Sequence, residues 1–498
     1  MPQKLTIAAG FALALASAGA GASVIRAASQ PAPVPHPDIQ LFFTALAEDE
    51  DQAEAALDQI ADSWRDGYAG MVWDLLRFMA PPSRPRVLPL DFGNPADPIR
   101  QRPSQELATP EHPTTKVWRR LMAFLEDQSD RRFRGDLLAA HQWIWEQPYD
   151  PHPEYAAFKG AWYGEIDPRF SDFFQAADTA TIRLDEIDWG GVPPNGIPPL
   201  RYPQHVAAAT ADYLEDDHIV FGIAVNGETR AYPRRILAWH EMAIDTVGGV
   251  ELTIVYCTLC GTVIPYESVA DGRHIHLGTS GLLYRSNKLM FDEDTKSLWN
   301  TFEWVPVVGP LVGSGVRLRH RSVVTTTWGE WRRTHPETTV LSLETGHDRD
   351  YSEGAAYRDY FATDRLMFEV PFKDGRLDNK DEVVVLLLED DRGTRHPLAI
   401  AADFLRDNRL YHTEHAGHQI AMLTTEEGAN RVYDVGDVRF VRILAGDQVE
   451  DASGGIWRVT EDAVIAQAET GRRLPRVAAQ RAFWFGWYAQ FPDTALIK

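Results

Sequence analysis

The segment DHIVFGIAVNGETRAYP (Asp217–Pro233) has a counterpart in DEVVVLLLEDDRGTRHP (Asp381–Pro397). Both segments have the same length, start with an acidic residue, continue through an apolar run and a turn, and end at proline. In the first segment, Asn226-Gly227 lies between two apolar runs, which is a strong signal for a β-hairpin. We therefore expect two β-rich units that follow one another in the chain and repeat the same hairpin.

The similarity continues beyond the hairpin, where two tryptophans at spacing i, i+3, a proline and a threonine recur without a gap. The matched residues are Trp328 and Trp484, Trp331 and Trp487, Pro336 and Pro492, Thr338 and Thr494, preceded by Gly315-x-Arg317-Leu318 and Gly471-x-Arg473-Leu474, and further upstream by Trp299 and Trp457. Tryptophans present in both copies are expected to be core anchors. The sequence thus predicts a first repeat at residues 182–345, a connecting segment at 346–380 and a second repeat at 381–498, related by a pseudo-twofold axis.

The N-terminal third has a different pattern of apolar residues. Apolar residues recur there near a period of 3.6, which predicts a helical domain at residues 31–181. One expected helix has a buried stripe of Leu137, Leu138, His141, Ile144 and Trp145, with Trp143 off the stripe. The expected fold class is α+β, with a helical domain followed by two tandem β-rich lobes. In the first lobe, Pro233 is expected to open a helix over Arg234–Ile244.

Residues 1–30 have the pattern of a signal peptide and the start of a linker. Lys4 precedes the apolar stretch Leu5–Ala16, and Ala16-Ser17-Ala18 is typical of a cleavage site. We expect an exported, periplasmic or extracellular protein without an integral membrane segment after cleavage; an uncleaved anchor is the alternative. The net charge of −23 provides no basic face for phosphates and excludes nucleic acid. The expected partner is an unknown small molecule or a cell-envelope protein.

The two repeats differ where chemistry is expected. Both cysteines of the chain lie in Cys257-Thr258-Leu259-Cys260 of the first repeat. The second repeat has no cysteine, and it has Phe404 opposite His240 and Phe491 opposite His335. This difference predicts one working lobe and one degenerate lobe.

Several short motifs follow one another between residues 182 and 380. They are His240-Glu241-x-x-x-Asp245-x-Val247-Gly248-Gly249, Tyr256-Cys257-x-Leu259-Cys260-Gly261-Thr262, Gly278-Thr279-Ser280-Gly281-Leu282-Leu283-Tyr284, Leu289-Met290-Phe291-Asp292, Trp299, Thr326-Thr327-Trp328, His335-Pro336 and Thr345-Gly346-x-x-Arg349-Asp350-Tyr351. In this order they resemble the signature of domain-of-unknown-function family 3179. The chain departs from that signature at Thr258, where the family usually has Pro, and at Phe291, where it has Tyr. The resemblance implies an exported setting and no established activity.

The first hypothesis for the cysteines is a metal centre. Two thiolates at this spacing need one or two further ligands, and the expected set is Cys257, Cys260, His240, Met290 and His335, followed by His276 and Glu241. Thiolate, imidazole and thioether are ligands that suit copper, and zinc is the second choice. The expected function is an exported metal-binding protein, which would be a copper-dependent oxidoreductase if it is an enzyme.

Two other interpretations of the cysteines remain open. Thiol–disulfide exchange is disfavoured because the residues after Cys260 are typical of a strand, not of the helix N-terminus that lowers a thiol pKa. A structural Cys257–Cys260 disulfide is the other interpretation. It would leave the protein as a cell-envelope binding or scaffold module. Further along, Arg349-Asp350-Tyr351 indicates an ion pair that braces a loop, with a substrate clamp as the alternative.

Overall fold

The computed structural model describes residues 35–79, 113–175, 180–468 and 471–498, and Pro37–Lys498 form one compact unit. The predicted signal peptide lies outside the described residues. Within the described part of the chain, no helix has both the length and the apolar character needed to cross a membrane.

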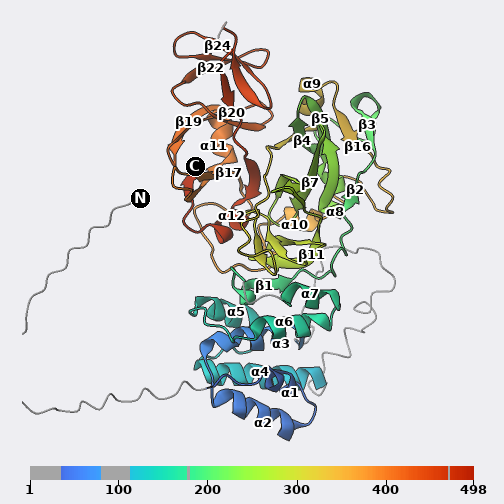
Figure 1. The fold of residues 1–498 in the computed structure, drawn as a ribbon, viewed down its shortest axis with the longest axis vertical. Coiled ribbons are helices and arrows are strands. Elements are labelled where there is room, and N and C mark those ends of the chain that lie inside the picture. Colours follow the sequence, from blue (N-terminus) through green and yellow to red (C-terminus); the bar gives the residue numbers. More distant parts are fainter. Residues whose placement is uncertain (1–34, 80–112, 176–179, 469–470) are drawn as a thin grey trace, which may run out of the picture. The chain divides into compact units, whose positions relative to one another are not determined.

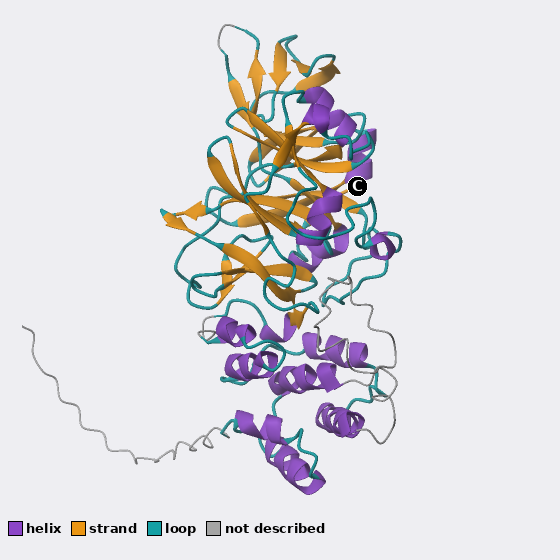
Figure 2. Ribbon diagram, turned by 90° about the vertical axis from the view of Figure 1, so that its right-hand side faces the viewer, coloured by secondary structure: helices purple, strands orange, loops and turns teal. Residues whose placement is uncertain are grey.

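Helices form the N-terminal part of the described chain, as the periodicity predicts (Figures 1 and 2). Three helices begin after an aspartate (Asp38, Asp49 or Asp136) whose carboxylate accepts a backbone N–H of the first turn. The helices are α1 (Ile39–Thr44), α2 (Glu50–Ala61), α3 (Ala69–Met79), α4 (Pro113–Ser129), α5 (Leu137–Glu146), α6 (Tyr155–Gly164) and α7 (Arg169–Phe174).

The buried face of α5 differs from the prediction. Leu138 is 44% exposed, whereas Trp143 is only 8% exposed. Trp143 is buried because its ring packs against Phe133, which precedes the helix, with 5.9 Å between ring centroids. Periodicity within one helix cannot reveal such a neighbour.

The helices share a hydrophobic core with the first strands of the β-rich region. Phe173 of α7 packs against Phe291, with 5.0 Å between ring centroids. Both belong to one buried cluster with Trp189, and Arg77 of α3 pairs with Asp188 beside it. The helical segment is therefore packed directly onto the β-rich region.

The predicted hairpin is confirmed in the first lobe (residues 182–345). Strands β4 (Ile219–Val225) and β5 (Glu228–Pro233) pair antiparallel across Asn226-Gly227. Both turn residues have positive φ (51° and 87°), as a type I′ turn requires. The sheet has the order β15-β4-β5-β16-β3, in which β15 (Val324–Thr327) is antiparallel to β4, β16 (Thr339–Leu341) is parallel to β5, and β3 (His205–Ala207) forms the edge.

The helix after this hairpin is shorter than predicted. Helix α8 spans Arg234–His240, and Met242–Val247 form β6 instead of continuing the helix to Ile244. Glu241 ends the helix because its backbone is left-handed, with φ of 54°. The sheet that contains β6 has the order β2-β6-β7-β8, with β2 (Leu200–Arg201), β7 (Val250–Cys257) and β8 (Thr262–Glu267).

A third sheet and short elements complete this part of the chain. The sheet has the order β1-β11-β12-β13-β14. Its strands are β1 (Ile187–Trp189), β11 (Leu277–Tyr284), β12 (Asn287–Asp292), β13 (Leu298–Asn300) and β14 (Pro306–Val308); beside it are the hairpin β9 (Val269–Ala270) and β10 (Arg273–His274), helix α9 (Trp328–Thr334) and helix α10 (Arg358–Phe361).

The central sheet of the second lobe (residues 381–498) has the order β27-β17-β18-β28. Strand β17 (Glu382–Glu389) pairs antiparallel with β18 (Arg395–Ala401) and β27 (Gln480–Phe483), and β28 (Ala495–Ile497) is parallel to β18. The other elements are α11 (Ala402–Asp407), β19 (Leu410–His415), β20 (His418–Thr424), β21 (Asn430–Asp434), β22 (Phe440–Leu444), β23 (Gln448–Asp451), β24 (Ile456–Val459), β25 (Ala463–Ala466), β26 (Arg473–Pro475) and α12 (Trp484–Gln490).

Each lobe has one helix with the repeated tryptophans. On α9, Trp331 Nε1 donates to Thr338 Oγ1 at 3.0 Å. On α12, Trp487 Nε1 donates to Thr494 Oγ1 at 2.9 Å. Both indoles are fully buried, so these tryptophans are core anchors, as expected. The fold class is α+β, with helices first and a β-rich region after them.

Candidate functional site

The two cysteines form a disulfide at the turn between β7 and β8. The side chains of Cys257 and Cys260 are 2% and 0% exposed. This corrects the expectation that both are metal ligands, because sulfurs that are bonded to each other are not free thiolates. Gly261 closes the turn with φ of +62°, a backbone conformation that glycine adopts without strain.

The disulfide turn is held by segments from later in the chain. The backbone N–H of Phe483 donates to the carbonyl oxygen of Cys260 at 2.8 Å. The hydroxyl of Tyr360 donates to the carbonyl oxygen of Leu259 at 2.7 Å. Gly486 of α12 packs so closely that a Cβ there would lie 2.6 Å from Cys260 Cβ. The turn is therefore a packing contact between the first lobe, the connecting segment and the second lobe.

A buried ion pair lies beside the same turn. Lys288 Nζ is 2.7 Å from Glu241 Oε2 and also donates to the Glu241 carbonyl at 3.1 Å. Glu241 Oε1 accepts hydrogen bonds from Thr258 Oγ1 at 3.3 Å and Tyr357 Oη at 3.1 Å. Burial lowers the pKa of Lys288, and the neighbouring Glu241 carboxylate opposes that shift. Both carboxylate oxygens of Glu241 thus have partners, and one of these partners, Thr258, belongs to the disulfide turn.

The sequence suggests Glu241 only as a secondary candidate for a metal ligand, and it does not reveal Lys288 as the partner of Glu241. The available signal was a lysine directly before the apolar run Leu289-Met290-Phe291. A lysine in a strand that is buried along its whole length needs a carboxylate partner.

His240, the last residue of α8, is fully buried and uses both ring nitrogens. Nδ1 is 2.9 Å from the Pro198 carbonyl oxygen, and Nε2 is 2.6 Å from Tyr351 Oη. Burial is the main cause that lowers the pKa of His240 to about 4, and the charge of Arg349 lowers it further. His240 is therefore a neutral ring within a hydrogen-bond chain.

Met290 and His335, the other two predicted ligands, have packing contacts of their own. Met290 is a fully buried core residue of β12, paired in register with Thr279 and Trp299. His335 stacks on Trp331 with 3.9 Å between ring centroids, and its Nε2 lies 3.5 Å from Glu461.

A different group has metal-ligand spacing. In the described part of the chain, the one group of three His, Cys, Asp or Glu residues with ligand atoms within 4.8 Å of one another is Glu215, Asp217 and His218. The group is largely exposed, and His218 Nδ1 already accepts the backbone N–H of Glu215 at 3.0 Å. His276, a further candidate, pairs with Asp294 at 2.8 Å. None of these residues lies at the disulfide.

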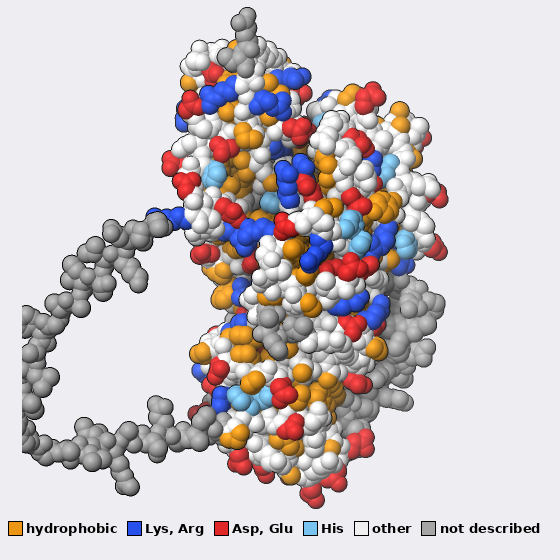
Figure 3. All heavy atoms as spheres, viewed as in Figure 1, with side chains coloured by type: hydrophobic (Ala, Val, Ile, Leu, Met, Phe, Trp, Pro, Cys, Tyr) orange, Lys and Arg blue, Asp and Glu red, His pale blue; other side chains and the backbone are white. Residues whose placement is uncertain are grey.

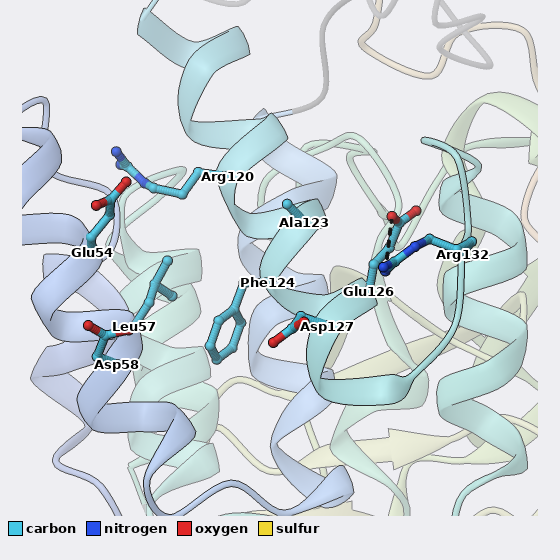
Figure 4. A pocket seen from close by; sticks show the side chains of 9 residues that line it. All are labelled: Glu54, Leu57, Asp58, Arg120, Ala123, Phe124, Glu126, Asp127 and Arg132. Atoms are coloured by element: carbon cyan, nitrogen blue, oxygen red, sulfur yellow. Dashed lines mark ion pairs between the residues drawn. The ribbon is translucent and has the colours of Figure 1, made fainter.

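A groove of about 530 Å³ lies between α2 and α4 in the helical segment (Figure 4). Its apolar side chains include Leu57 and Phe124, and carboxylates such as Glu54 and Asp58 surround them. On the face drawn in Figure 3, acidic and basic side chains are interspersed over the molecule. The groove contains none of the predicted ligands, so it is separate from the expected centre.

The comparisons with known proteins give one positive result. A family model described as "Protein of unknown function (DUF3179)" matches residues 194–494. No curated protein and no solved structure matches the chain. The resemblance in the sequence covers residues 182–380, and the family match extends beyond it into the second lobe as far as residue 494. Because it covers more than half of the chain, the protein belongs to domain-of-unknown-function family 3179.

Proposed function

We propose that this protein is an exported cell-envelope binding module in which Cys257–Cys260 is a structural disulfide. The observation that carries the proposal is the burial of the disulfide turn against Phe483 and Gly486 of the second lobe. Thiol–disulfide exchange requires attack on an accessible sulfur. Since neither sulfur is accessible, exchange and metal uptake would both require the turn to open.

The surroundings of His240 support the same proposal. Its Nδ1 and Nε2 both have partners within the protein. A metal at Nε2 would have to displace the Tyr351 hydroxyl. The hypothesis of copper, or zinc as second choice, therefore needs two rearrangements, one at the disulfide and one at this ring. Export is supported by the N-terminal pattern and by a disulfide, which persists in oxidising compartments.

We also infer that the two lobes arose by duplication. The central sheets share the strand order and the mix of parallel and antiparallel pairs, and the two Trp–Thr hydrogen bonds are equivalent. Phe491 packs on Trp487 as His335 stacks on Trp331. The aromatic ring is common to both positions, which supports a packing role for His335.

The test uses mature protein from periplasmic expression, with Cys257→Ser/Cys260→Ser as the matched control. Thiols are counted in the native state, after denaturation and after reduction, and copper and zinc are measured by elemental analysis. We expect no titratable thiol before reduction and no stoichiometric metal. The control should fold with stability lower by roughly 2 kcal/mol, the loop-closure contribution of so short a loop.

Two results would overturn the proposal. Stoichiometric copper or zinc that is absent from the control would establish the metal-binding hypothesis and identify the ion. Two thiols that titrate in the native protein would establish a reduced pair and reopen exchange.

A further inference from the structure

A polar cluster lies where the end of α8 meets the loop after β16. His240 belongs to the helix, and Thr345, His347, Arg349 and Tyr351 belong to the loop. The rings of His240 and His347 are 5.0 Å apart, and Tyr351 Oη contacts both His240 Nε2 and Thr345 Oγ1 at 2.6 Å. His240 is fully buried and His347 is exposed, so the cluster extends from the core to the surface.

The directions of the inner hydrogen bonds follow from one carbonyl group. The Pro198 oxygen can only accept, so His240 Nδ1 carries the proton and Nε2 is the acceptor. Tyr351 must then donate to Nε2, and its oxygen accepts the Thr345 hydroxyl proton. His240 thus gives its proton to the Pro198 carbonyl, and Tyr351 and Thr345 give theirs within the cluster. They form a fixed support and have no donor left for a ligand.

The outer residues do have unused donors. Arg349 Nε is buried and has no hydrogen-bond partner among the described residues. Its Nη1 makes a weak contact of 3.3 Å with the carbonyl oxygen of Asp348. The predicted bracing ion pair is not formed, since Asp350 Oδ1 instead accepts the backbone N–H of Ser352 at 2.9 Å. The guanidinium carbon lies 5.8 Å from the centre of the Trp239 ring, which is within the range of a cation–π interaction.

The charge of Arg349 decides which kind of ligand fits. After burial, its guanidinium is a cause that lowers the pKa of both His240 and His347. A metal cation between the two imidazoles would face this positive charge. An oxyanion would be attracted by this charge, and the exposed His347 ring beside it would offer an N–H. Arginine is suited to such binding because its planar fork matches carboxylate and phosphate oxygens.

We propose that Arg349 and His347 bind a small oxyanion, a carboxylate or phosphate group, against the His240–Tyr351–Thr345 support. The assignment names the ligand class of the proposed binding module and rests on that proposed function. It does not depend on the state of the cysteines. Thiol or metal measurements that contradict the structural disulfide would therefore leave the anion site untouched, and failure to bind an anion would leave the disulfide untouched.

The test is calorimetric titration of the mature protein with inorganic phosphate and with acetate, at constant ionic strength against chloride. The variants are Arg349→Gln, His347→Gln and, as control, Arg392→Gln at an exposed arginine outside the cluster. We expect saturable binding to the wild type and to the control. Affinity should fall about tenfold or more in Arg349→Gln, as loss of charge-assisted hydrogen bonds predicts, and several-fold in His347→Gln. Arg349→Lys should recover only part of the loss, because it restores the charge without the fork.

Each outcome decides the assignment. Saturation by phosphate alone identifies phosphate-bearing ligands, and saturation by acetate as well identifies carboxylates. The proposal fails if neither anion saturates the wild type, or if Arg349→Gln binds as tightly as the control. It also fails if copper or zinc binds and is lost in His347→Gln. Since the His347 side chain is exposed, that variant remains informative even if Arg349→Gln does not fold.

Discussion

The buried neutral state of His240 predicts a pH dependence of stability that one substitution should remove. Burial lowers its pKa from the usual 6.5 to about 4 in the folded protein. The unfolded chain therefore binds more protons between these values, and stability is lost as pH falls through this window. The worked loss is about 2 kcal/mol at pH 5 and approaches roughly 3 kcal/mol below pH 4. His240→Gln cannot be protonated, so it should lack this contribution.

The assay is urea unfolding of wild type and His240→Gln at pH 7.5 and pH 5, followed by tryptophan fluorescence. Other buried histidines, such as His320, whose pKa is also lowered to about 4, contribute equally to both proteins and cancel in the difference. Tyr351→Phe is the matched control because it loses the hydrogen bond but keeps the buried imidazole. Parallel pH curves for wild type and His240→Gln would refute the reasoning.

Three further substitutions test the packing around the disulfide turn and the repeated tryptophan. Lys288→Met leaves the Glu241 carboxylate buried and unpaired, which should lower the free energy of unfolding in urea by about 3–5 kcal/mol. Adding Glu241→Gln should recover part of that loss. A second loss of equal size in the double variant would contradict the pairing. Gly486→Ala places a Cβ against the disulfide and should lower the free energy of unfolding by about 1–3 kcal/mol. Gly375→Ala is the control and should leave stability unchanged, because no atom lies within 4 Å of the added Cβ. Equal stabilities of the two variants would count against the close contact. Trp487→Phe removes the indole donor from a buried threonine hydroxyl and should lower the unfolding free energy by about 1 kcal/mol or more, and an unchanged midpoint would show that the bond contributes nothing.

Local signals in the sequence were sufficient for some elements and not for others. The hairpin at Asn226-Gly227 could be predicted because the turn type depends only on the two residues that form it. The end of α8 could not, because Glu241 adopts its left-handed conformation among partners that come from β12 and the connecting segment. A periodicity that continues through Ile244 contains no information on those partners.

The sequence drew attention to Cys257 and Cys260, because the segment 381–498 has no cysteine, but it left the state of their sulfurs open. Spacing alone cannot separate a metal pair from a disulfide, since both place two sulfurs close together. The decisive facts are the burial of the turn and its contact with Phe483. Cys260 and Phe483, which form that contact, belong to different lobes and lie far apart in the sequence, so no short motif records it.

The contact between the disulfide turn and the second lobe has a consequence for biogenesis. The core that surrounds Cys257 and Cys260 also contains Trp484 and Trp487 of the second lobe, which lie far along the chain from the cysteines. A nascent or truncated chain that ends before residue 480 would present this apolar surface to solvent. The C-terminal lobe, although it lacks the cysteines, thus acts as an internal cover for the lobe that carries them.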